Sequence, residues 1–88
     1  MKKIKLDDGY TVSVDETIAD DIELLDELVS MSEGDGFALS RIAKRVLEEE
    51  ERKKLYDHLR GENGRAPSSQ VFAAILEIFR KMGEKGKN

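Results

Sequence analysis

A strongly apolar stretch near the C-terminal end, residues 71–82, constrains the fold of this chain more than any other feature. Its large apolar residues are Val71, Phe72, Ile75, Leu76, Ile78, Phe79 and Met82. At about 100° of rotation per residue in an α-helix, these side chains span an arc of roughly 160°. The charged residues of the stretch, Glu77, Arg80 and Lys81, share the opposite side. We therefore expect a helix that needs cover on more than one flank, with the other elements packed around it.

The length and composition of the chain favour one small domain spanning residues 1–88. Eighty-eight residues leave no room for two hydrophobic cores. The chain has no cysteine, which excludes disulfides, cysteine zinc sites and thiol catalysis. No apolar run approaches the roughly 20 residues of a membrane-spanning helix, and residues 1–10 lack the apolar segment of a signal peptide. We expect a cytoplasmic protein that does not bind membranes.

Two short alternating segments near the N-terminus predict a β-hairpin within residues 1–15. Apolar and polar residues alternate over residues 3–6 and again over residues 10–14. The intervening Asp-Asp-Gly ends in Gly9, and glycine accepts the positive φ of a tight turn without a Cβ clash. Two strands alone are marginally stable. The hairpin must therefore lie on the helices or extend the sheet of another chain.

The next segment predicts an amphipathic helix over residues 16–31, with Asp15 as its N-cap. Its apolar residues form two neighbouring stripes, one of Ile18, Ile22, Leu25 and Val29 and one of Leu24, Leu28 and Met31. Together the stripes span about half the circumference. Asp21 falls inside this arc, and we explain it by the favourable position of a carboxylate near a helix N-terminus.

The middle of the chain predicts a helix over residues 37–47, followed by a charged run without apolar residues at residues 48–54. One long helix would fit, since Glu48 and Arg52 begin a series of favourable i, i+4 pairs. A kink near Glu48 would also fit, with the glutamates in the first turn of a new helix that runs to about residue 60. We favour the kink, because a small domain does not easily pack a helix of over 20 residues.

Glycine and proline residues indicate where the last helix begins and ends. The Gly-Glu-Asn-Gly run at residues 61–64 predicts a turn, and Pro67 suits the first turn of the last helix. Gly83 is expected to end that helix and leave residues 84–88 as a frayed tail. The predicted fold class is mainly α, of the α+β type. An N-terminal β-hairpin precedes three or four short helices in a small bundle over residues 16–83.

The residues that usually carry chemistry form no recognisable site. His58 is the only histidine, and the sequence places no partner base or nucleophile beside it. The glycines lie in separate turns rather than in a phosphate-binding loop. The carboxylates of residues 32–36 do not match the spacing of a calcium-binding EF-hand loop. We expect no enzyme activity, no cofactor and no metal.

The net charge of −4 conceals a strong asymmetry. Residues 7–35 contain eleven acidic residues and no Lys or Arg, whereas the chain from Arg41 onward has twelve basic and eight acidic residues. Either the two halves attract each other within the fold, or an acidic face steers a basic partner and repels nucleic acid. Residues 39–46 look like the first helix of a helix-turn-helix, but Leu47 and four glutamates follow. Phosphates would repel these glutamates. A small DNA-binding regulator is therefore the alternative, and not the first, hypothesis.

The remaining hypothesis is a protein-interaction module. The predicted helices carry more apolar surface than 88 residues easily cover, and an uncovered strip would bind a partner helix or a second copy of the chain. The opposite interpretation, in which the apolar faces of the helices cover one another completely within the monomer, stays open. The candidate apolar contacts are Phe37, Leu39 and Tyr56. The candidate acidic face consists of Asp20, Glu23 and Glu27.

Four segments also carry a family resemblance: LDDGYTVSVDE at 6–16, DIELLDELV at 21–29, LYDHLRGENGRAP at 55–67 and FAAILEIF at 72–79. On these, nearly the whole chain resembles the tail assembly chaperone-like proteins of long-tailed phages and prophages of Gram-positive bacteria. Glu48 departs from the pattern, because the resemblance leads us to expect a helix-breaking glycine there.

The resemblance implies a function that composition does not. It implies binding to the tape-measure protein and recruitment of tail-tube subunits in the host cytoplasm. It also implies absence from the mature virion. A structural adaptor that stays in the particle is a further alternative.

Overall fold

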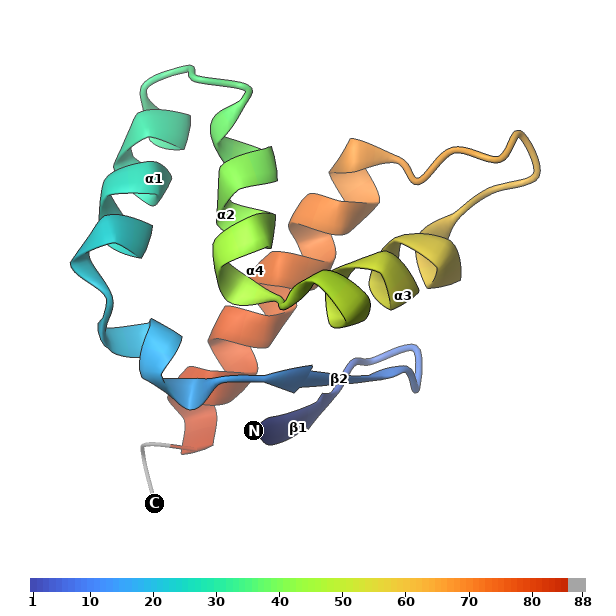
Figure 1. Ribbon diagram of the computed structural model, residues 1–88, viewed down its shortest axis with the longest axis horizontal. Helices are drawn as coiled ribbons and strands as arrows, with labels where there is room; N and C mark the ends of the chain where they lie inside the picture. Colours follow the sequence, from blue (N-terminus) through green and yellow to red (C-terminus); the bar gives the residue numbers. More distant parts are fainter. Residues whose placement is uncertain (86–88) are drawn as a thin grey trace.

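A β-hairpin, a short 3-10 helix and four α-helices follow one another along residues 1–85 (Figure 1). The computed structural model describes residues 1–85, with side chains described for residues 1–83. The elements are β1 (Lys2–Lys5), β2 (Thr11–Val14), η1 (Glu16–Asp20), α1 (Ile22–Ser32), α2 (Ala38–Val46), α3 (Glu49–Leu59) and α4 (Ser68–Lys85). This arrangement confirms the predicted fold class, a mainly α domain with an N-terminal hairpin.

The hairpin pairs β1 and β2 antiparallel, from Lys2 opposite Val14 to Lys5 opposite Thr11. Its turn closes where the Leu6 amide donates to the Tyr10 carbonyl oxygen at 2.7 Å. Gly9 adopts the positive φ, at 95°, that this turn requires. The side chains on one face are buried: Ile4, Leu6, Val12 and Val14. The hairpin therefore lies on the helices of its own chain, one of the two outcomes expected for it.

The helix expected over residues 16–31 is in fact two helices, because Asp21 interrupts it. The Asp15 carboxylate accepts a hydrogen bond from the Thr17 amide and caps η1. Asp21 then takes an extended conformation, with φ −123° and ψ 110°, and accepts from the Glu23 amide as the N-cap of α1. A side-chain acceptor two residues before a free amide favours a new helix start over continuation of the old helix. The prediction of one helix was therefore wrong at this position.

The kink near Glu48 is confirmed. Leu47 and Glu48 are both extended, with ψ of 133° and 160°, and separate α2 from α3. The first turn of α3 is acidic, as a helix N-terminus favours. Two shorter helices bury both Leu47 and Leu55, which have 1% and 0% exposure. The turn needs no glycine at Glu48, because an extended conformation is open to any residue.

The last helix starts where Pro67 predicted and ends later than expected. The Pro67 carbonyl oxygen accepts from the Val71 amide at 3.1 Å and opens α4. Before it, the Gly64 amide donates to the Gly61 carbonyl oxygen at 2.9 Å in the expected turn. At the other end, α4 continues through Gly83 to Lys85, so Gly83 does not end the helix. Residues 86–88 of the expected frayed tail lie outside the described residues.

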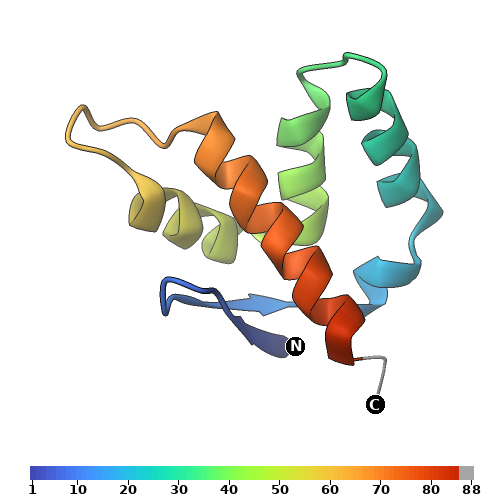
Figure 2. The ribbon, with the colours of Figure 1, turned by 180° about the vertical axis from the view of Figure 1, so that it is seen from behind.

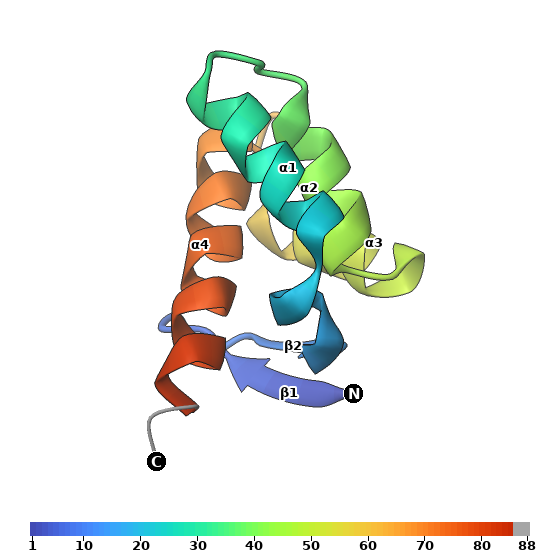
Figure 3. The ribbon, with the colours of Figure 1, turned by 90° about the vertical axis from the view of Figure 1, so that its left-hand side faces the viewer.

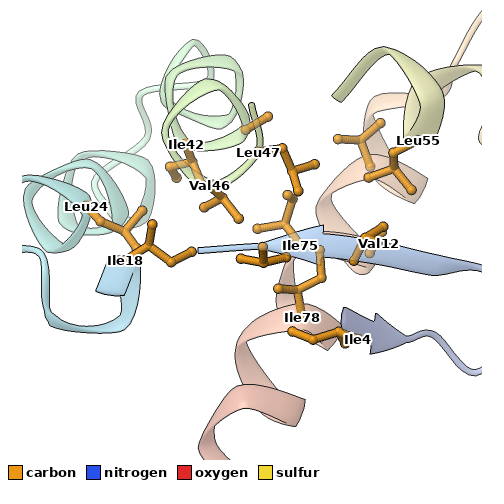
Figure 4. Packing of buried hydrophobic residues seen from close by; sticks show 14 of the residues in the cluster. Ile4, Val12, Ile18, Leu24, Ile42, Val46, Leu47, Leu55, Ile75 and Ile78 are labelled. Carbon is orange, nitrogen blue, oxygen red and sulfur yellow. The ribbon is translucent and has the colours of Figure 1, made fainter. Parts of the chain in front are cut away.

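The chain packs around α4. This helix contacts β1, η1, α2 and α3, and it crosses in front of the other elements in Figure 2, which shows the molecule from behind. Its buried side chains, Val71, Ala74, Ile75 and Ile78, join those of the hairpin, α2 and α3 in one hydrophobic cluster (Figure 4). The expectation that residues 71–82 organise the fold is confirmed. The wide apolar arc is nevertheless not fully covered, because Leu76 remains 45% exposed.

Two glutamates fasten the hairpin to the helices. The Glu51 carboxylate on α3 accepts from the Ser13 amide on the outer edge of β2 at 2.8 Å. The Glu77 carboxylate on α4 accepts from the Asp7 amide at the hairpin turn. Lys81 adds a bond from its ammonium group to the Lys5 carbonyl oxygen at 2.6 Å. These contacts satisfy backbone groups that a two-stranded sheet leaves open at its edges.

Candidate protein-binding surface

Ion pairs between α1 and α2 account for part of the charge asymmetry. The Arg41 guanidinium lies 2.8 Å from the Glu27 carboxylate and 2.6 Å from that of Asp35. Arg45 similarly lies 3.0 Å from Asp21 and 3.3 Å from Glu23. The acidic first half and the basic second half of the chain therefore attract each other within the fold, one of the two interpretations of the asymmetry.

Asp35 provides a pH test of this attraction. The hydrogen bond from Arg41 holds the pKa of the Asp35 carboxyl below its ordinary value. The unfolded chain then binds more protons than the folded chain near that value, so the stabilisation is present above about pH 4 and is lost as pH falls through the lowered pKa. We expect the stability difference between wild type and Asp35→Asn, measured by urea unfolding, to shrink over this range.

The Asp35→Asn variant is a narrow change, since asparagine retains the oxygen that accepts from the Phe37 amide. Asp26→Asn, at an exposed position of α1, is the matched control and should show a smaller difference at pH 7. A difference for Asp35→Asn that stays constant down to pH 2 would contradict the assignment.

The three apolar candidates from the sequence come together in space. Phe37, Leu39 and Tyr56 line one open pocket of about 250 Å³, between the start of α2, α3 and the start of α4. Phe37, immediately before α2, is 81% exposed, the most exposed large apolar side chain in residues 1–83. We call this hollow the Phe37 pocket. Its lining is mainly apolar.

The three acidic candidates lie elsewhere, on η1 and α1. Asp20 is exposed at the end of η1. Glu23 is also exposed, although it pairs with Arg45. Glu27 is a correction to the predicted solvated face, because its side chain is only 23% exposed and is held by Arg41. The antiparallel packing of α1 on α2 turns Glu27 inward, and no periodicity in the sequence specifies that packing.

An apolar row that was not among the predicted contact residues lies on the outside of α1. Ile22, Leu25 and Val29 are 67%, 52% and 47% exposed, although they were expected to share a face with Ile18. The break at Asp21 separates Ile18, which is buried, from the other three. Their spacing of i, i+3 and i+7 places them on one side of α1. We call these three residues the α1 stripe. The i, i+3, i+7 pattern was the sequence signal for it. The pattern does not reveal which side of the helix faces the core.

A groove between α1 and α4 continues the α1 stripe. It has a volume of about 310 Å³ and is lined by Ala19, Leu24, Leu28, Phe79, Met82 and Gly83. Leu24 and Leu28 also line the recess beside Ile22 and Leu25, so the stripe and the groove form one surface. Figure 3 looks onto α1, with α4 beside it in this view. We call this hollow the α1–α4 groove.

His58 is part of a packing contact between α3 and the hairpin turn. Its ring stacks on Tyr10, with centroids 4.1 Å apart. Its Nε2 atom lies 2.7 Å from the Asp8 carboxylate, whose pKa this hydrogen bond lowers. The contact joins residues 50 positions apart. This arrangement gives His58 a structural role in holding the turn against α3.

Three arginines on α2 and α3 that could contact a nucleic acid are engaged within the protein. Arg41 and Arg45 are held by carboxylates of α1 and of the loop before α2. Arg52 points back to the Leu47 carbonyl oxygen at 3.4 Å. A phosphate backbone would have to displace these partners and approach the acidic start of α3.

Comparisons of this chain with protein-family models, with curated proteins and with solved structures find no match. No helix within the described residues is long and apolar enough to cross a membrane. Nor do residues 1–85 contain a group of three or more His, Cys, Asp or Glu side chains placed to hold a metal ion.

Proposed function

We propose that this protein is a non-enzymatic chaperone that holds apolar helices of another polypeptide while a long phage tail is assembled. The observation that carries the proposal is the exposed α1 stripe beside the α1–α4 groove. Contiguous exposed apolar surface on a folded chain marks a site of protein interaction. The resemblance to tail assembly chaperones supplies the client, the tape-measure protein, with the tail-tube protein as a second partner.

The size of this surface suits a complex that forms and dissociates. Full burial of one aliphatic side chain contributes about 1.5–3 kcal/mol. Covering Ile22, Leu25 and Val29, which are between 47% and 67% exposed, would contribute roughly 3–5 kcal/mol before the entropic cost of association is subtracted. Such binding is reversible, as a chaperone absent from the mature virion requires. Its place of action would be the cytoplasm of the bacterial host.

Co-expression with a tape-measure fragment tests the proposal. We expect the soluble fraction of the fragment to rise several-fold with the wild-type chain, and the two proteins to co-purify. The triple variant Leu25→Ser, Val29→Ser, Phe37→Ser removes both apolar surfaces and should abolish the effect. Lys53→Ser, which removes an exposed charge on α3, is the matched control. A fragment equally insoluble with and without the wild-type chain would refute the proposal.

The adaptor alternative makes a different prediction about the particle. A chaperone is absent from purified virions, whereas an adaptor remains at a fixed copy number. Mass spectrometry of mature particles distinguishes the two. Detection of this chain at the copy number of a tail component would contradict the chaperone hypothesis and support the adaptor hypothesis.

A further inference from the structure

We infer that the α1 stripe and the α1–α4 groove bind an amphipathic helix that carries Lys or Arg beside its apolar face. The inference rests on the proposed function only for the premise that the protein holds another polypeptide. It adds the binding face, the secondary structure of the bound segment and the sign of its charge. The Phe37 pocket is a separate surface and serves as the internal control.

The form of the surface favours a helix as the occupant. Ile22, Leu25 and Val29 follow the i, i+3, i+7 spacing by which one helix packs along another. α1 has 11 residues, or a length of roughly 16 Å at 1.5 Å per residue. A partner helix of about three turns would cover it. The apolar side chains of that helix would enter the α1–α4 groove, beside Leu28 and Phe79.

The charge around the surface favours a basic partner. Asp26 and Glu33 are exposed and follow the same side of α1 as the stripe, and Asp20 lies beside Ile22 in the recess. Residues 7–40 contain no Lys or Arg to balance these carboxylates. The arginines of α2 are already bonded to other acids of this region, and Arg80 of α4, which follows the groove residue Phe79, lies 3.5 Å from the Asp7 carboxylate. Lys or Arg beside the apolar face of the partner would meet negative potential along α1.

The same charges argue against a second copy of this chain as the occupant. Two α1 helices packed stripe to stripe would bring Asp26 and Glu33 of each copy close to carboxylates of the other. Like charges facing across an interface are destabilising. Charge complementarity therefore selects a different polypeptide.

Two synthetic peptides test the inference on the full chain. One is an 18-residue amphipathic helix of leucine and lysine, and the other is its leucine and glutamate counterpart. We expect the lysine peptide to bind with micromolar affinity in low salt, measured by fluorescence anisotropy, and to bind several-fold more weakly in high salt. The glutamate peptide should bind at least about tenfold more weakly.

Three variants locate the binding face. Leu25→Ser with Val29→Ser should weaken lysine-peptide binding about tenfold or more, whereas Phe37→Ser should leave it unchanged. Asp26→Lys with Glu33→Lys keeps the apolar stripe and should reduce the preference for lysine over glutamate. Circular dichroism and urea unfolding confirm that each variant is folded; the exposed positions make loss of folding an unexpected result.

Several outcomes would overturn the inference. One is equal binding of the two peptides, and another is lysine-peptide binding lost in Phe37→Ser but kept in Leu25→Ser, Val29→Ser. A third is a wild-type dimer in sedimentation that the Leu25→Ser, Val29→Ser variant dissociates, since that makes a second copy the occupant. If this variant solubilises the tape-measure fragment as well as wild type does, the inference fails and the proposed function stands. If the peptides behave as expected but wild type leaves the fragment insoluble, the function fails and the inference stands.

Discussion

Replacing Leu55 with alanine is expected to lower the free energy of unfolding by about 3 kcal/mol. Leu55 is fully buried on α3, and in Figure 4 it lies on the side of the core where α3 meets β2. The change removes apolar atoms from a packed interior and leaves a cavity that the surrounding elements fill only in part. A domain of this size has a stability of roughly 0.05–0.15 kcal/mol per residue, so the loss is a large fraction of the total.

Urea unfolding followed by circular dichroism measures this effect. The matched control is Leu76→Ala, the same substitution on α4 at a side chain that is 45% exposed. It should cost less than about 1 kcal/mol. Equal losses at the two positions would mean that the described core is not the core of the protein in solution.

Replacing Glu51 with alanine is expected to cost about 1.5 kcal/mol, the second largest effect we expect from a single substitution. The Glu51 carboxylate accepts from the Ser13 amide at 2.8 Å, and its side chain is only 22% exposed. Alanine leaves this β2 amide without its protein partner at a partly buried position, where water only partly replaces the bond. The hairpin would then lose one of the contacts that hold it against α3.

Glu49 is the control for Glu51, two residues away in the same run of glutamates. Its side chain is 70% exposed and pairs with Lys53 on the helix surface. Glu49→Ala should therefore cost only about 0.3–0.5 kcal/mol. Glu51→Gln, which retains an acceptor oxygen, should recover part of the loss. Equal effects of the two alanine substitutions would show that the bond to Ser13 contributes nothing.

Local signals in the sequence were sufficient for most of the fold. The hairpin followed from strand alternation and from Gly9, and the last helix from its apolar period after Pro67. The kink at Glu48 was predicted from length alone, because a long helix would not pack in a small domain. The prediction of a continuous helix over residues 16–31 was wrong at Asp21, where the side chain caps a following amide in competition with helix continuation. Such a residue is compatible with either outcome, and the packing of the helices decides between them.

The candidate surface was only partly predictable. Phe37, Leu39 and Tyr56 were selected separately as partly exposed, and the structure brings them into one pocket. The α1 stripe was not selected, because its residues looked like core. An apolar period shows that a helix has an apolar side, but a helix with two apolar rows can bury only the one that meets its neighbours.

By itself, the sequence determined the hairpin and its turn, the start of the last helix after Pro67, the apolar character of α4 and the absence of cysteine chemistry. These properties depend on residues that are close together in the sequence, so they do not require knowledge of how the helices pack. The tertiary structure decided which row of α1 faces solvent, which glutamate among residues 48–51 reaches Ser13, and which acids Arg41 and Arg45 neutralise. These outcomes join residues far apart in the chain, and they are set by how the helices cross and by which surfaces are left over once the core is full.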